Sequence, residues 1–93
     1  MKNQLITVVG KIVNFEPKNG DFFTMSEINH IMKSKEVFSN PIDGTNYTYF
    51  FKKESKNNKI INEKALDILQ GMSTLIECVI GDILIVNNKF LKK

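Results

Sequence analysis

The sequence contains no arginine and no tryptophan, so all thirteen basic residues are lysines. Arginine contacts guanine through two parallel hydrogen bonds and stabilises phosphoryl transition states. Its absence argues against base-specific recognition of duplex DNA and against arginine-finger chemistry. Lysine still attracts phosphate as a point charge. Ten acidic residues leave a formal net charge of +3, which by itself is weak evidence for nucleic-acid binding.

Residues that hold metals or act as nucleophiles are scarce as well. The single cysteine, Cys78, has no partner for an internal disulfide and lies in an apolar run, where we expect a buried thiol in a reducing compartment. The only histidine, His30, has no cysteine beside it, and a metal site needs three or four ligands. No Walker loop, GxGxxG loop or HExxH helix is present. We therefore predict no metal, no cofactor and no enzymatic activity.

Long apolar runs are also missing. No stretch approaches the roughly 18 to 20 residues of a transmembrane helix, and the apolar part of the N-terminal segment is too short for a secretory signal. We expect a cytoplasmic protein without a membrane partner. The 93 residues are enough for one domain, residues 1–93, and their 42% hydrophobic and 25% charged content is ordinary for a globular protein.

Runs of β-branched residues and turn signals predict a mainly β protein with one short helix. Residues 5–15 carry a glycine in their middle, which predicts one long strand with a bend. An Asn-Gly turn then predicts a hairpin, with residues 22–28 as its second strand. Residues 29–45 have no clean period, and we interpret them as a long connection, a candidate mobile loop, with a short strand near 36–38.

The second half of the chain has clearer signals. Residues 46–53 are the most aromatic stretch and predict a strand with rings on both faces, followed by a polar loop. Asn62 is placed to cap a helix of sequence EKALDILQ, which Gly71 is expected to end. Gly-Asp and Asn-Asn turns then separate three short segments that we expect to be strands. These segments are residues 73–80, 83–86 and 89–91.

Three main strands, a capped helix and further strands after it follow the element order of the OB-fold, a five-stranded Greek-key barrel. The run ALDILQGMSTLIECVIGDILIVNNKFLKK, residues 65–93, resembles the last third of bacterial single-stranded-DNA-binding proteins. There a helix ends in a glycine turn, a strand follows, and a glycine introduces the final hairpin. The run TVVGKIVNFEPKNGDFFTMSEI, residues 7–28, is similar to the first hairpin of that family. The resemblance implies an OB-fold barrel that binds single-stranded DNA.

The aromatic strand is the candidate surface for single-stranded nucleic acid, because each base that stacks on a ring gains roughly 1 to 3 kcal/mol. Tyr47, Tyr49 and Phe51 share one face of this strand and Phe50 lies on the other. Because one of the two faces must be core, the alternative for each ring is simple packing. The tyrosines are the better candidates, since their hydroxyl groups favour a half-exposed position. Phe22 and Phe38 are secondary candidates.

Lysines flank the same strand. Lys52, Lys53, Lys56 and Lys59 fall within eight residues, with only Glu54 opposing them, which suggests a track for a phosphate backbone. The alternative is a solvated face that serves solubility. Lys33 and Lys35 border the strand in the preceding loop. The residues that we predict to bind nucleic acid are Tyr47, Tyr49, Phe51, Lys52, Lys53, Lys56, Lys11 and Phe22.

The prediction is a non-enzymatic OB-fold module that binds single-stranded DNA, as a small replication accessory protein of a mobile genetic element. The alternative is a protein-interaction subunit that binds and modulates a DNA polymerase, a primase or another replication enzyme. Tyrosine and phenylalanine suit both surfaces. The lysines separate the two hypotheses, because a protein interface should tolerate loss of Lys52 and Lys53 better than a phosphate track would.

Overall fold

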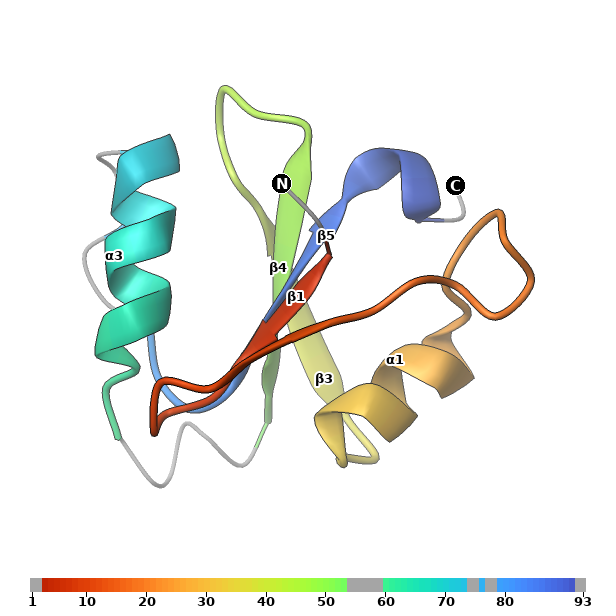
Figure 1. Cartoon of the computed structure of the whole chain (residues 1–93), viewed down its shortest axis with the longest axis horizontal. Helices are drawn as coiled ribbons and strands as arrows, with labels where there is room; N and C mark the ends of the chain where they lie inside the picture. The colour runs from red at the N-terminus through yellow and green to blue at the C-terminus, as the bar shows by residue number, and fades with distance from the viewer. Residues whose placement is uncertain (1–2, 54–59, 74–75, 77–78, 92–93) are drawn as a thin grey trace.

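The computed structural model describes residues 3–53, 60–73, 76 and 79–91. Five strands form one antiparallel sheet in the order β2-β1-β5-β4-β3 (Figure 1). The strands are β1 (Gln4–Ile6), β2 (Ile12–Asn14), β3 (Val37–Pro41), β4 (Tyr47–Lys52) and β5 (Ile83–Asn87). The helices are α1 (Met25–Met32), α3 (Glu63–Met72) and the 3₁₀ helix η1 (Asn88–Phe90). The sheet is open, with β2 and β3 at its edges, so the five-stranded barrel predicted from the sequence is wrong while the mainly β class is confirmed.

The central strand β5 is buried on both of its faces. Ile83, Leu84, Ile85 and Val86 are each at most 1% exposed. Successive side chains of a strand alternate between faces, so Ile83 and Ile85 pack with α3, while Leu84 and Val86 pack with α1. A continuous apolar run of this kind is typical of a strand that is covered on both sides.

Residues 5–15, predicted to be one bent strand, instead belong to a hairpin of β1 and β2. Thr7 N–H donates to the Lys11 carbonyl at 2.9 Å, and Gly10 N–H donates to the Thr7 carbonyl at 2.9 Å. Gly10 has a φ of 88°, a left-handed conformation that is strained for any residue with a Cβ atom. The glycine therefore marks the turn between β1 and β2 rather than a bend within a strand.

The strand predicted over residues 22–28 is wrong, because α1 begins at Met25. The Thr24 hydroxyl accepts a hydrogen bond from Glu27 N–H at 3.1 Å, as an N-cap does. Glu27 Oε2 accepts from Lys18 N–H at 3.0 Å, which ties the start of the helix to the preceding turn. That turn is present, but it leads into a helix and not into a second strand.

The region 29–45, interpreted as a long loop, holds the end of α1 and all of β3. The helix stops at Lys33, whose φ of 55° is left-handed. The short strand expected near residues 36–38 is present and extends to Pro41. Only a short turn then separates β3 from β4, so the pair forms a hairpin.

The predicted strand over residues 46–53 and the predicted helix are confirmed as β4 and α3, with Asn62 as the N-cap of α3. Gly71 does not end this helix, which continues to Met72. The predicted strand over residues 83–86 corresponds to β5, whereas 89–91 contains most of η1 and is not a strand. The predicted polar loop at 54–59 and much of the predicted strand 73–80 lie outside the described residues.

Candidate binding surface on β3 and β4

The rings of β4 contribute to both cores of the protein. Tyr47, Tyr49 and Phe51 share one face, as expected, and pack half-buried against the core that α3 covers. Phe50 points to the other face, where it is 5% exposed in the core under α1. Packing therefore takes up much of the ring surface that the sequence assigned to stacking.

Three of the aromatic side chains form a row that runs out to the edge of the sheet. The ring centroids of Phe38 and Phe51 are 5.6 Å apart, and those of Phe51 and Tyr49 are 6.1 Å apart. Phe38, the outermost member, is 39% exposed. Asn40 Nδ2 donates a hydrogen bond to the Tyr49 hydroxyl at 3.2 Å and fixes that ring. We call Phe38, Phe51 and Tyr49 the aromatic row.

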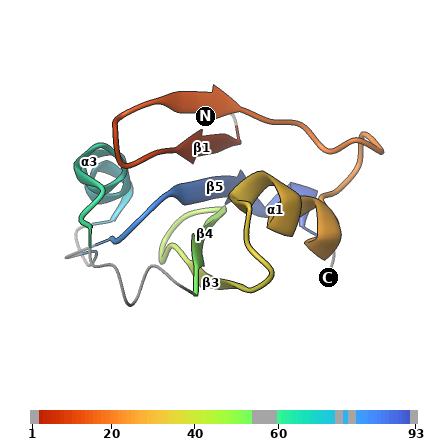
Figure 2. The ribbon, with the colours of Figure 1, turned by 90° about the horizontal axis from the view of Figure 1, so that it is seen from below.

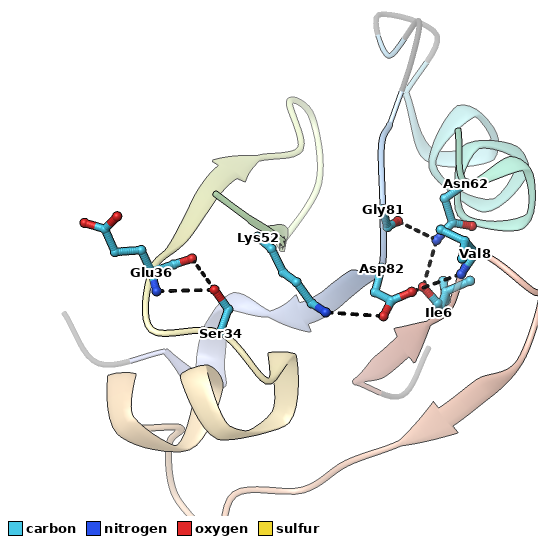
Figure 3. Close-up of polar contacts among 8 residues, drawn as sticks. All are labelled: Ile6, Val8, Ser34, Glu36, Lys52, Asn62, Gly81 and Asp82. Atoms are coloured by element: carbon cyan, nitrogen blue, oxygen red, sulfur yellow. Dashed lines mark hydrogen bonds and ion pairs between the residues drawn. The ribbon is translucent and has the colours of Figure 1, made fainter. Parts of the chain in front are cut away.

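The two lysines at the end of β4 each have an acidic partner. Lys52 Nζ lies 3.7 Å from Asp82 Oδ2, and the other oxygen of Asp82 accepts from Val8 N–H at 3.0 Å (Figure 3). Lys53 Nζ lies 2.7 Å from Glu36 Oε2. A phosphate group that bound these two lysines would have to compete with the carboxylates of Asp82 and Glu36, which already pair with them.

The other lysines of the predicted set do not join this pair. Lys11 is exposed in the β1–β2 hairpin, which lies at the opposite side of the sheet from β3 (Figure 2). Lys56 and Lys59 lie outside the described residues. Among the described residues, no further lysine of the predicted set joins Lys52 and Lys53, which are neighbours in the sequence and pair with different acidic residues.

Phe22 does not lie in a strand, as the sequence suggested, but at a cavity of about 510 Å³ on the α1 side of the sheet. Phe23, Met25 and Ile28 line this cavity, and Ser39 and Phe50 contribute to it from β3 and β4. None of its lining residues is charged. The cavity could not be predicted from the sequence, because it depends on α1, and the alternation over residues 22–28 favours a strand.

The outer edge of β3 is the feature of this region that sequence analysis did not identify. Lys53 N–H donates to the Glu36 carbonyl at 3.2 Å, and Ile42 N–H donates to the Tyr47 carbonyl at 2.9 Å. In an antiparallel ladder, residues that bond to the partner strand alternate with residues that do not. With the observed register, the backbone N–H and C=O groups of Phe38 and Asn40 therefore form the hydrogen bonds with β4.

It follows that the N–H and C=O groups of Val37 and Ser39, together with the Pro41 carbonyl, point away from β4. No described strand lies beyond β3, and its five residues include no charged side chain. We call these outward backbone groups the open edge. Pro41 was a usable signal in the sequence, because proline within a strand is confined to edges and ends.

The described residues contain no cluster of side chains that could hold a metal ion. Among them, no group of three or more histidine, cysteine, aspartate or glutamate side chains gathers. His30 is exposed on α1, on a shallow open surface that it shares with Lys33 and Lys35. None of the described helices combines the length and the apolar character needed to span a membrane.

Comparisons of the chain with protein-family models, with curated proteins and with solved structures find no match. The resemblance to single-stranded-DNA-binding proteins therefore remains a prediction from the sequence pattern. The geometry of the β3–β4 region supplies the evidence for a function.

Proposed function

We propose that this protein is a non-enzymatic protein-interaction module that binds an extended segment of a partner beside β3. The observation that carries the proposal is the open edge, with its outward N–H and C=O groups at Val37 and Ser39. Edge strands in monomeric proteins are commonly protected by charged side chains, by proline or by short length. The proline of β3 is at its last position and leaves the N–H groups of Val37 and Ser39 in place. β3 has five residues and no charged side chain, so it can accept a further strand.

The two faces of the sheet beside this edge suit the side chains of an added strand. Such side chains would alternate between the faces. On one face they would lie next to Phe38, the exposed end of the aromatic row. On the other face they would lie next to Ser39, at the uncharged cavity. Backbone hydrogen bonds would supply affinity. The Phe38 ring and the apolar lining of the cavity, rather than the Ser39 hydroxyl group, would supply selectivity. A replication enzyme remains the class of partner that the sequence resemblance suggests.

Substitution of Ser39 tests whether its outward backbone N–H group binds the partner. Peptides selected from a displayed library on the wild-type protein are expected to lose at least about tenfold in affinity for Ser39→Pro, because proline removes the outward N–H group. The ladder to β4 should survive, since Ser39 N–H does not contribute to it. Fluorescence polarisation of the selected peptides measures the change.

Ser39→Ala is the matched control, because it removes the hydroxyl group and keeps the N–H group. We expect the selected peptides to bind this variant as they bind the wild type. Peptides that bind Ser39→Pro and wild type equally well would show that the open edge is not the binding site. Circular dichroism of both variants establishes that they are folded.

Single-stranded nucleic acid is the second candidate ligand. One observation favours it: Phe38 is 39% exposed at the end of a row of three rings, and exposed rings stack on bases. Against it, Lys52 and Lys53 are each paired with an acidic side chain.

Titration of labelled single-stranded DNA at about 50 and 200 mM salt decides between the candidates, because phosphate-driven binding weakens steeply over this interval. For a protein-interaction module we expect no binding tighter than about 10⁻⁴ M at the higher salt, the weak end of non-specific association. Tight, salt-dependent binding that Phe38→Ala weakens would instead favour the nucleic-acid function. Fluorescence anisotropy is a suitable measurement.

A further inference from the structure

We infer that the open edge binds β3 of a second copy of this chain, so that two sheets join into one continuous antiparallel sheet. The inference rests on the proposed function, because it assigns the partner of the same edge. Two identical strands can pair in this way only around a two-fold axis, which requires that the edge be complementary to itself.

The backbone of β3 meets this requirement when the axis passes beside Phe38. Val37 then lies opposite the partner's Ser39, and Ser39 lies opposite the partner's Val37. Both are residues whose N–H and C=O groups point outward, so each outward N–H group of the two copies meets a carbonyl. Pro41 has no N–H group, so no backbone donor at that position is left without an acceptor.

The side chains of β3 fit the same register. Phe38 lies opposite the partner's Phe38 in a non-hydrogen-bonded pair, where Cα atoms are about 4.5 Å apart and side chains contact each other closely. This contact covers the exposed end of the aromatic row and joins the rows of the two copies. On the opposite face, the partner's Val37 brings an apolar side chain next to Ser39 at the uncharged cavity.

Charges around the edge favour this arrangement as well. No charged residue lies among residues 37–39, which pair with each other across the axis. The same register places exposed Glu36 and Lys35 opposite the partner's Asn40 and the partner's Pro41, at the outer ends of the joined strands. The antiparallel direction brings the start of one β3 near the end of the other. Exposed Lys33 and Lys35 precede the strand, and exposed Asp43 follows it. Glu36, directly before the strand, is already paired with Lys53. The basic end of each copy therefore approaches an acidic residue of the other, at both ends of the joined strands.

Sedimentation equilibrium of the wild-type protein tests the inference directly. We expect the average mass to rise from 10.7 kDa towards twice that value as the concentration rises towards about 1 mM. At that concentration, half of the chains are already dimeric if the association is worth only about 4 kcal/mol. Ser39→Pro should weaken dimerisation at least about tenfold, because it removes one of the two outward N–H groups of each copy. Ser39→Ala should dimerise like the wild type.

Engineered disulfides test the register. In a Cys78→Ser background, Phe38→Cys is expected to form a covalent dimer under mild oxidation, because the two introduced thiols face each other across the axis. Ser39→Cys should not form one, since its symmetry mate lies diagonally, at about 7 to 8 Å. Covalent dimer from Ser39→Cys and none from Phe38→Cys would contradict the register proposed here.

The outcomes that contradict dimerisation distinguish this inference from the proposed function. A monomer at all concentrations overturns dimerisation through β3, while peptides that require the Ser39 N–H group would still support a partner of another kind. A dimer that Ser39→Pro leaves unchanged also overturns the inference, because it forms through a different surface. A Ser39-dependent dimer that selected peptides dissociate supports both.

Discussion

Replacing Asn62 with alanine should lower the free energy of unfolding by about 3 kcal/mol or more, because three backbone groups, two of them fully buried, lose their partner together. The Asn62 side chain is fully buried. Its Nδ2 donates to the Ile6 carbonyl at 2.8 Å and to the Gly81 carbonyl at 2.9 Å (Figure 3). Its Oδ1 accepts from Ala65 N–H at 3.0 Å. One amide thus joins β1, the turn before β5 and the start of α3.

The size of this effect follows from burial. A buried donor or acceptor without a partner costs about 1 to 3 kcal/mol, and loss of an N-cap alone costs about 0.5 to 2 kcal/mol. Domains of this size are stable by only about 5 to 15 kcal/mol, so the variant should be near the limit of folding. Urea denaturation followed by circular dichroism measures the change.

Asn87 offers a matched control. Its side chain also accepts from a backbone N–H group, that of Lys89 at 3.0 Å, but at the start of the 3₁₀ helix η1 and only half-buried. Asn87→Ala should cost less than about 1 kcal/mol. Equal losses for the two variants would show that the three-way contact of Asn62 adds nothing beyond an ordinary cap.

Replacing Leu84 with alanine should destabilise the protein by about 2 to 5 kcal/mol through the cavity that it leaves. Leu84 has no exposed surface and lies in the central strand, between β1 and β4. It belongs to the core beneath α1, together with Ile28 and Phe50. Strands on both sides and a helix above limit how far the surroundings can collapse into the space.

Urea denaturation also measures this loss, and Val9→Ala is the control. Val9 is 86% exposed in the β1–β2 turn, so its truncation should change stability by no more than about 0.5 kcal/mol. A loss below about 1 kcal/mol for Leu84→Ala would mean that the core under α1 is not closely packed. The dependence on urea should keep its slope if both variants unfold in one step.

The elements that could be predicted are those with strong local signals. Asn62 and the apolar stripe that follows predict α3, and the alternating rings of β4 predict a strand. The run Ile83–Val86 predicts a buried strand in the same way. In α1 two local signals conflict: alternation around Phe23 and Met25 favours a strand, while Thr24 and Glu27 favour a helix start.

Part of the candidate surface could also be predicted from the sequence. The aromatic strand was identified, including the face that Tyr47, Tyr49 and Phe51 share. How much of each ring is covered could not be predicted, because that depends on where α3 packs. The ion pairs of Lys52 and Lys53 also join residues from different elements, so the pattern of lysines could not reveal them.

By itself, the sequence determined the mainly β class, the positions of β4, α3 and β5, and the absence of the motifs that common catalytic sites require. Only the tertiary structure decided that β5 lies between β1 and β4, that the sheet stays open, and that β3 is an edge. The physical reason is the distance along the chain: Gln4 pairs with Ile85 across most of the sequence. Strand order depends on such long-range pairs and on the helices that cover each face, and neither leaves a local pattern.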